Sequence, residues 1–526
     1  MPKHPSSREK SPRPDADARP DPPSPTRDLV DRETVLVLLL VVVVVGAWLR
    51  FRGLETQSLW NDELWTWQIA DKESLHDVLT TGKLPLDVHP PLHFMMHYYL
   101  QKYVGESETV LRMPSAIAGV LTIVAIYLLG RRLYSDTEGL IAAALTAVFI
   151  FPIRYSQEAR AYSMLFLFST LTVYFLLPVL RDLCAGKRPP LWPTVGYMTC
   201  ALVTSYLHYF GLFLILVQAL AMGGVLLLKR ARALGWLALL YLPVAAGYVP
   251  WMPMVMRAAR IKSFWITRPS TNPFAAFTFH LQYVVNHSYV FAWTAMGLWA
   301  WVLGRAVYEK RTGKSDPAGK PRTPYAGLVL MLWIVVPFAV PYVKSLISTP
   351  VIVVRNLIVI LPAIYLLTAR GIARIPLLRT YVGLLTAAVC IALVCHGVYG
   401  LHYYNLPHKD QFRDVVRYVL GHDRAAEDIP IVAVSYGDRF FDYYFRRLGS
   451  PKRVDVAGGT ARDIPKVRDF LTRRKPQYLW FVWGHKTPEQ EFLDYLMTDY
   501  TPIDAKRFPV RAGVVLLSRN PAAPTR

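Results

Sequence analysis

The topology of this chain depends on residues 91–104, PLHFMMHYYLQKYV. The segment is apolar enough to suggest a transmembrane helix, but it has only 14 residues, contains two histidines and begins at a proline pair. A helix needs about 20 apolar residues to cross a bilayer core, and shorter apolar helices can lie along the membrane surface. We therefore predict an interfacial helix here. Counting it as a span would invert the orientation of every later segment.

Longer apolar blocks on both sides of this segment indicate an integral membrane protein. The 526-residue chain is 53% hydrophobic and 18% charged, and blocks such as 35–49, 212–228 and 381–398 match the thickness of a bilayer core. The net charge is +22, but the charges lie in short segments between the apolar blocks. This distribution is typical of topology signals and lipid headgroup contacts, and it argues against nucleic-acid binding.

The basic residues orient the chain, because cytoplasmic loops collect lysine and arginine. Residues 1–34 hold eight prolines and many charges, which predicts a disordered cytoplasmic tail. When 111–130 is taken as the second span, Arg131 and Arg132 and every later basic loop fall on the cytoplasmic side. The predicted spans number about eleven: 35–51, 111–130, 139–153, 161–180, 192–208, 211–228, 236–252, 285–304, 326–344, 353–369 and 380–400.

Two extracytoplasmic regions follow from this topology. One is the long first loop, 52–110. The other is the C-terminal region, where amphipathic stretches such as DQFRDVVRYVL alternate with β-type runs such as PIVAVSY, a pattern that predicts a soluble α/β domain. The predicted domains are a tail (1–34), a transmembrane domain (35–400) and an extracytoplasmic α/β domain (405–526).

Two adjacent carboxylates in the first loop, Asp62 and Glu63, are the first candidates for chemistry. They stand in SLWNDELWTW (58–67), among tryptophans that favour the membrane interface. Partial desolvation raises the basicity of a carboxylate, so Asp62 is a candidate general base. The alternative is a solvated loop acid held between tryptophan anchors.

A second cluster, Asp87 and His89 in DVHPPL (87–92), stands at the start of the predicted interfacial helix. The proline pair fixes the backbone there. Asp87 is equally suited to cap the helix, and His89 to orient a carboxylate, bind a phosphate or ligate a metal.

Cationic candidates lie on the same predicted side as Asp62. The segment RYSQEARAY (154–162) carries two arginines that can bind a phosphate bidentately, or instead pair with Glu158 at the interface. Arg355, near the outer end of the tenth span, is placed to meet a lipid phosphate or to extend its side chain to the interface. Carboxylates and cations at one membrane face suit a reaction whose leaving group is a lipid phosphate.

Together these motifs resemble the bacterial GT-C glycosyltransferases of family 39, relatives of the protein O-mannosyltransferases and of the aminoarabinose transferase that acts on lipid A. The likeness covers roughly residues 35–400, and one departure is Asn356, where many relatives have tyrosine. The resembling elements, in family order, are LWNDE (59–63), DVHPPL (87–92), RMPSA (112–116) with GRRL (130–133), YSQEARAY (155–162) and RNL (355–357) with Pro362.

The resemblance implies a GT-C fold, a polyprenyl-phosphate-linked sugar as donor, and transfer with inversion to an acceptor hydroxyl. It implies that Asp62 is the general base supported by Glu63, and that Arg355 holds the donor phosphate. A divalent metal ion is left open, because GT-C enzymes differ in this respect. The other residues implied to line the site are Asp87, His89, Arg154, Tyr155, Glu158, Arg160 and Tyr162.

The predicted location is the bacterial inner membrane, with the N-terminus cytoplasmic and the C-terminal domain outside. The acceptor is left open between a lipid, a polysaccharide and a protein. The alternative functions are a transporter or lipid flippase of cell-envelope assembly, and a non-catalytic scaffold. A transporter is expected to show repeats and mid-membrane ionisable residues, whereas this sequence shows no repeat and has its charges at the membrane faces. The sequence therefore favours an enzyme.

Overall fold

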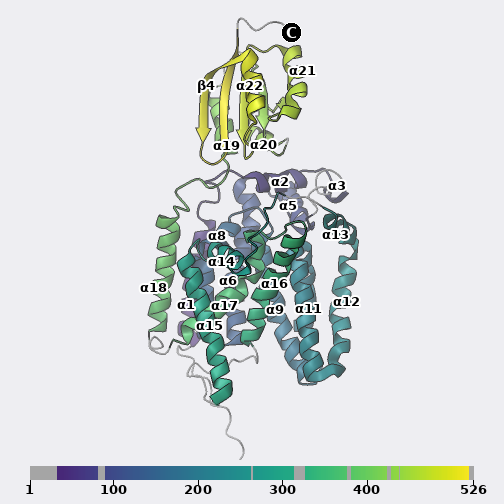
Figure 1. Ribbon diagram of the computed structural model, residues 1–526, viewed down its shortest axis with the longest axis vertical. Coiled ribbons are helices and arrows are strands. Elements are labelled where there is room, and N and C mark those ends of the chain that lie inside the picture. The colour runs from purple at the N-terminus through teal and green to yellow at the C-terminus, as the bar shows by residue number, and fades with distance from the viewer. Residues whose placement is uncertain are drawn as a thin grey trace, which may run out of the picture.

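The computed structural model describes residues 32–80, 89–261, 265–312, 326–375, 381–422, 428–437 and 439–520. A bundle of long helices carries a small sheet domain at one end (Figure 1). This arrangement confirms the predicted fold class, a polytopic helical membrane protein with a C-terminal α/β domain.

Every predicted span coincides with a helical segment. Seven segments of the described residues are long and apolar enough to cross a membrane, or eight when the bent pair α7 and α8 counts as one span. One of the seven, Tyr209–Ala259, contains two predicted spans, and α10 and α18 are shorter apolar helices. The bounds are α1 (Arg32–Phe51), α6 (Glu108–Leu133), α7 (Asp136–Val148), α8 (Ile150–Ser156), α9 (Tyr162–Cys184), α10 (Leu191–Leu207), α11 (Tyr209–Arg230), α12 (Gly235–Tyr248), α15 (Tyr289–Thr312), α16 (Ala326–Ile347), the 3-10 helix η3 (Val354–Ile360), α17 (Leu361–Ala373) and α18 (Val382–Cys395).

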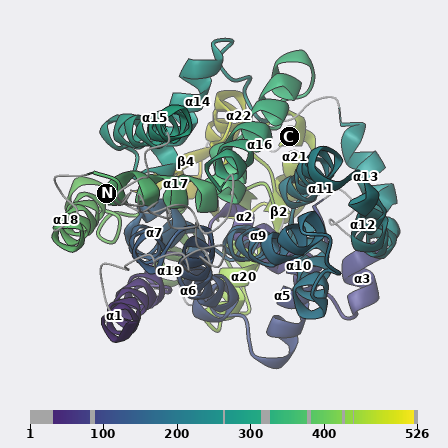
Figure 2. The ribbon, with the colours of Figure 1, turned by 90° about the horizontal axis from the view of Figure 1, so that it is seen from below.

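Close helix packing holds the centre of the bundle. Viewed along the helices, α17 lies centrally, with α10 to α12 on one side and α1, α15 and α18 on the other (Figure 2). Helices α6 and α7 approach through two glycines, because a Cβ atom on Gly130 would lie only 2.6 Å from Cα of Gly139. Small residues at such contacts are typical of membrane helices, where packing rather than the hydrophobic effect drives association.

Short helices cover the end of the bundle next to the sheet domain (Figure 1). In the first loop these are α2 (Asn61–Ala70), α3 (Leu75–Thr80) and α5 (Leu92–Tyr103). Helix α5 coincides with the segment predicted as interfacial and is not among the candidate spans. Two more short helices, α13 (Met252–Ala259) and α14 (Pro273–Val284), follow α12.

The C-terminal domain is a five-stranded mixed sheet in the order β2-β1-β3-β5-β4. Strand β1 pairs in parallel with β2 and β3, whereas β5 is antiparallel to β3 and β4. Helices α19 and α20 cover one face, and α21 and α22 cover the other. The bounds are α19 (Phe412–Gly421), β1 (Ile431–Val434), α20 (Phe440–Arg447), β2 (Val456–Ala457), α21 (Ile464–Arg474), β3 (Tyr478–Gly484), α22 (Gln490–Asp499), β4 (Tyr500–Phe508) and β5 (Ala512–Arg519).

The first loop and the C-terminal domain share one apolar core. Leu59, Leu64 and Trp67 of the loop belong to the cluster formed by α19, α20 and the adjoining face of the sheet. Ion pairs surround this contact: Arg439 lies 2.6 Å from Asp71, Arg413 lies 3.1 Å from Glu108, and Arg446 pairs with Glu106. In each pair the cation belongs to the C-terminal domain. The domain is therefore packed directly on the segment that carries Asp62.

Candidate active site

Asp62 and Arg355 meet at the end of the bundle, although 293 residues separate them in sequence. Asp62 lies in the first turn of α2, and Arg355 lies in the first turn of η3. Nη1 of Arg355 donates to Oδ2 of Asp62 at 2.6 Å, and the side chains are 20% and 16% exposed. The other carboxylate oxygen, Oδ1, accepts a hydrogen bond from Asn61 Nδ2 at 3.1 Å. The pair is thus enclosed on most sides but reachable from solvent.

Aromatic rings fix the guanidinium of Arg355. Its Cζ lies 5.3 Å from the ring centroid of Trp265 and 5.8 Å from that of Tyr162. Cation–π contacts of this kind orient an arginine without neutralising its charge. The Tyr162 ring is followed by those of His208 and His89, with successive centroids 5.8 and 5.7 Å apart. The rings of Tyr162 and His208 therefore lie between His89 and Arg355.

A second arginine, Arg160, approaches Asp62 from the segment between α8 and α9. Its Nη1 lies 3.4 Å from the backbone oxygen of Asp62 and 3.3 Å from Oγ1 of Thr66. The guanidinium groups of Arg160 and Arg355 thus both lie at Asp62, one at its backbone oxygen and one at its carboxylate. Such a pair of planar cations is suited to a phosphate group.

Glu63 points away from this site into a buried ion network. Both of its carboxylate oxygens accept from Arg112 at 2.7 Å, Oε1 also accepts from the backbone N–H of Ala159 at 2.8 Å, and the side chain is fully buried. Burial alone would raise the pKa of this carboxyl, but Arg112 and Lys409 outweigh it and lower the pKa to about 2. Glu63 therefore stays ionised and joins α2 to α6 and to the segment carrying Arg160.

Lys409 brings the C-terminal domain into the same network. Its Nζ lies 3.0 Å from Oε2 of Glu63 and donates to the backbone oxygen of Gln157 at 2.9 Å. Burial lowers the pKa of this ammonium to about 8, with the charge of Arg112 acting in the same direction. A cation from just before α19 thus contacts the residue next to Asp62.

Three other predicted site residues lie farther from the Asp62–Arg355 contact: Arg154, Tyr155 and Glu158. Arg154 Nε is 3.5 Å from Oε1 of Glu158, which matches one of the two alternatives predicted for this segment. Burial raises the pKa of Glu158, and its Oε2 has no hydrogen-bond partner among the described residues. The Tyr155 ring packs on Tyr162 with centroids 5.1 Å apart. These three residues support the rings and backbone that surround the pair.

The helix α5 is attached to the site through His93. Its Nε2 lies 3.1 Å from the backbone oxygen of Ala159 and 3.4 Å from the hydroxyl of Thr66. Burial lowers the pKa of this imidazole, so the neutral ring donates from Nε2 to the Ala159 carbonyl. His93 thus holds the Arg160 segment against α5.

The structure brings together four of the predicted site residues directly: Asp62, Arg160, Tyr162 and Arg355. Asp87 lies outside the described residues. Within the described ranges, no group of three or more His, Cys, Asp or Glu side chains is placed to hold a metal ion. Sequence reasoning missed four contributors, whose partners are distant in the chain: His93, Arg112, Trp265 and Lys409.

Comparisons with known proteins agree with the predicted fold. Residues 88–252 match the family model described as dolichyl-phosphate-mannose-protein mannosyltransferase. The crystal structure of ArnT from Cupriavidus metallidurans in the apo state is similar over 92% of this chain and 98% of its own, with a TM-score of 0.57 and 16% identity. The same enzyme bound to undecaprenyl phosphate gives a TM-score of 0.55 at 16% identity over 93% and 98% of the two chains.

A more distant match is the archaeal oligosaccharyltransferase AglB from Archaeoglobus fulgidus, solved with an inhibitory peptide and a dolichol phosphate. Its TM-score is 0.51 at 12% identity, over 85% of this chain and 69% of that protein. No curated protein matches the sequence at a significant level. The predicted GT-C fold is thus confirmed over most of the chain, and residues 88–252 resemble the mannosyltransferase family model.

Proposed function

We propose that this chain is a membrane glycosyltransferase that moves a monosaccharide from a polyprenyl-phosphate donor to an acceptor hydroxyl, with inversion, on the extracytoplasmic side. The observation that carries the proposal is the Asp62–Arg355 pair, which sets a carboxylate base beside a cation suited to a phosphate. Support comes from the two fold relatives, whose structures hold undecaprenyl phosphate in ArnT and a dolichol phosphate in AglB.

The proposed reaction is one displacement at the anomeric carbon. The oxygen of the acceptor hydroxyl attacks the anomeric carbon while Asp62 accepts the hydroxyl proton. The bond between the anomeric carbon and the phosphate oxygen breaks. The electron pair of that bond leaves on the polyprenyl phosphate, whose charge Arg355 and Arg160 stabilise. The products are the glycosylated acceptor and polyprenyl phosphate, with the proton on Asp62.

One guanidinium couples the donor to the base. Arg355 donates to Oδ2 of Asp62, one of the two carboxylate oxygens of the proposed base. A donor phosphate competes for the same guanidinium, and a shift of Arg355 toward the phosphate frees Oδ2 for the acceptor hydroxyl. We therefore expect the donor to bind first and the acceptor second. Glu63, which is paired with Arg112 and Lys409, anchors the loop next to Asp62 throughout.

The test is a transfer assay with the purified full-length protein. Radiolabelled polyprenyl-phosphate sugars are incubated with membrane fractions, and the labelled product is identified. The proposal predicts a labelled acceptor and release of polyprenyl phosphate in equal amounts. Movement of an unconsumed lipid-linked sugar across reconstituted vesicles, with no bond broken, would instead establish the transporter alternative.

A further inference from the structure

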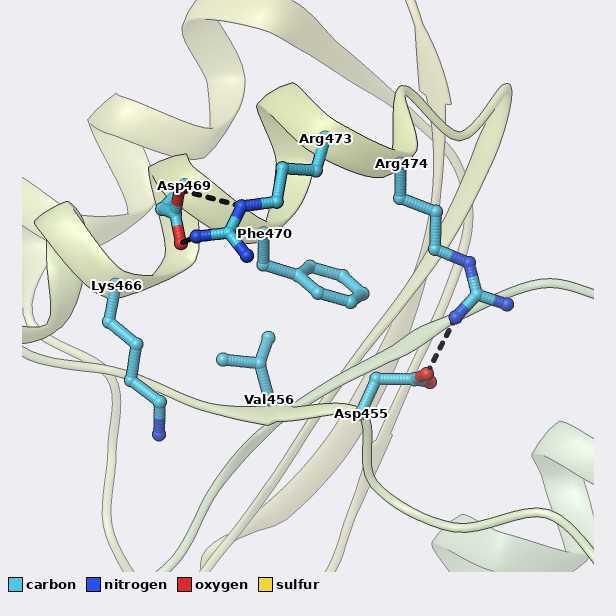
Figure 3. A pocket seen from close by; sticks show the side chains of 7 residues that line it. All are labelled: Asp455, Val456, Lys466, Asp469, Phe470, Arg473 and Arg474. Atoms are coloured by element: carbon cyan, nitrogen blue, oxygen red, sulfur yellow. Dashed lines mark hydrogen bonds and ion pairs between the residues drawn. The ribbon is translucent and has the colours of Figure 1, made fainter.

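Two features of the C-terminal domain carry charged side chains: a cavity and one edge of the sheet. Of these two, the edge faces the membrane domain. A cavity of about 540 Å³ lies between β2 and α21 (Figure 3). Its arginines are already paired, Arg473 with Asp469 at 2.5 Å and Arg474 with Asp455 at 2.8 Å. This cavity provides control positions rather than a site.

The second feature is the edge of the sheet that faces α2. After β1 the chain passes through α20 to β2, which lies on one side of β1. It then passes through α21 to β3, which lies on the other side of β1. The carboxyl ends of β1 and β3 therefore form a point where the strand order reverses, which is where ligands bind in open α/β sheets. The arrow of β4, which runs in the same direction as β3, points toward the membrane domain (Figure 1).

The loops at this edge carry aromatic and polar side chains. Tyr436 follows β1, His485 and Lys486 follow β3, and Arg511 lies in the turn before β5. Tyr436 is 58% exposed, and its ring centroid lies 5.5 Å from that of His485. His485 has φ of +64°, a left-handed conformation that is strained in a residue with a side chain and is concentrated at functional sites.

The first loop completes the cluster from the other side. The Trp60 ring lies 6.2 Å from the His485 ring, so His485 stands between Trp60 and Tyr436. Asp410 Oδ2 lies 2.6 Å from Nδ1 of His485, and Arg511 Nη2 lies 2.9 Å from the same nitrogen. Among the described residues, Nε1 of Trp60 is buried without a hydrogen bond, whereas Oδ1 of Asp410 is ion-paired with Arg511 Nε at 3.7 Å. The cluster thus contains one indole donor whose hydrogen bond is not made.

These groups match the chemistry of a sugar ring. A pyranose offers an apolar C–H face to an aromatic ring and hydroxyls that both donate and accept hydrogen bonds at its edge. Trp60 and Tyr436 supply the rings, and His485 and Arg511 supply polar groups that reach the surface. Asp410 is buried and holds both of these polar side chains in place.

We infer that the Trp60–Tyr436–His485–Arg511 cluster binds a saccharide unit of the acceptor, so the acceptor is a glycan or glycolipid. The inference rests on the proposed glycosyl transfer. Trp60 is two residues before Asp62, so their Cα atoms lie within about 7 Å. A sugar held against Trp60 places its hydroxyls beside the proposed base. The C-terminal domain is then the part of the chain that selects the acceptor.

The experiment uses the full-length protein, a radiolabelled polyprenyl-phosphate sugar, and envelope fractions from the source cells as acceptors. One fraction is protease-treated, which leaves saccharides and glycolipids, and the other contains only the envelope proteins. We expect label in the protease-treated fraction. Tyr436→Ala and Arg511→Ala should each raise the amount of that fraction needed for half-saturation roughly three- to tenfold, with the donor KM unchanged.

Matched variants separate this role from a loss of folding. Tyr436→Phe keeps the ring and should need less acceptor for half-saturation than Tyr436→Ala. Arg473→Ala removes a cation from the distal cavity and should change neither KM. Label found only in the protein fraction, or variants at position 436 and 511 with wild-type saturation, would overturn the inference. Failure of the wild-type protein to break down the donor with either fraction would instead refute the proposed transfer itself.

Discussion

Arg355 donates a 2.6 Å hydrogen bond to Asp62 across 293 residues of sequence. The contact joins the first loop to the start of η3 and places both candidate reacting groups at the end of the bundle that the C-terminal domain covers. In the proposed reaction, the Arg355 side chain therefore couples donor binding to proton acceptance.

Arg355→Ala should weaken donor binding more than it slows the bound donor's reaction. The variant lacks the cation that is proposed to pair with the donor phosphate. Loss of one partner from an enclosed charge pair costs roughly 2 kcal/mol of binding free energy or more, so affinity for undecaprenyl phosphate should fall about 30-fold or more. Equilibrium binding of undecaprenyl phosphate to detergent-solubilised protein measures this. Arg473→Ala is the control, since it removes an arginine far from the site. Normal affinity in Arg355→Ala would assign the phosphate to another cation.

Glu63→Gln should flatten the dependence of stability on acid pH. The folded pKa is about 2 and the ordinary value is 4.5, so ionised Glu63 stabilises the fold above pH 4.5 and this stabilisation is lost as pH falls toward 2. The shift corresponds to roughly 3 kcal/mol. Thermal unfolding in detergent between pH 7 and 3 should show a lower Tm at pH 7 for the variant and a smaller fall below pH 4.5. Parallel Tm profiles for variant and wild type would show that the network does not stabilise the fold.

Lys409 should set the alkaline limit of activity. Its pKa is lowered to about 8, so the ammonium that contacts Glu63 is present below pH 8 and is lost as pH rises through that value. We expect kcat of the wild type to fall above pH 8. Lys409→Arg should move this fall to higher pH, because arginine stays protonated. A pH–rate profile of Lys409→Arg that is identical to that of the wild type would show that Lys409 does not set the alkaline limit.

The orientation of the chain predicts which cysteines a membrane-impermeant maleimide reaches. Cys184 ends α9 on the predicted cytoplasmic side, and Tyr436 is exposed on the C-terminal domain. In a background where the other cysteines are replaced, Tyr436→Cys should be labelled in intact cells, whereas Cys184 should be labelled only after permeabilisation. The reverse pattern would place the candidate site on the cytoplasmic side.

The membrane fold could be predicted because block length and basic-loop placement follow directly from bilayer thickness and orientation. For the 91–104 segment, the short length, the two histidines and the proline pair distinguished α5 from a span. In the C-terminal domain, β1 lies within its predicted run PIVAVSY, whereas β4 was missed. Its sequence, YTPIDAKRF, contains a proline and several charges, as edge strands do.

The candidate site was predictable only where its residues form local motifs. Asp62 and Arg160 stand in short motifs that drew attention to them. Lys409 stands in no such motif, and Arg112, although it begins RMPSA, was given no role, because their shared partner Glu63 lies 346 and 49 residues away. Nothing in local periodicity indicates such pairs. The role of Glu63 changes for the same reason: the family resemblance implied an acid that supports Asp62, whereas its contacts make it an anchor for the loop.

The most direct test of the account is transfer by Asp62→Asn with a radiolabelled polyprenyl-phosphate sugar. The account predicts that turnover falls by at least ~100-fold, as expected for loss of a general base, while undecaprenyl phosphate still binds and the protein remains folded. Asp77→Asn, on helix α3 of the same loop, should transfer at the wild-type rate. Wild-type turnover by Asp62→Asn would show that Asp62 is not the base.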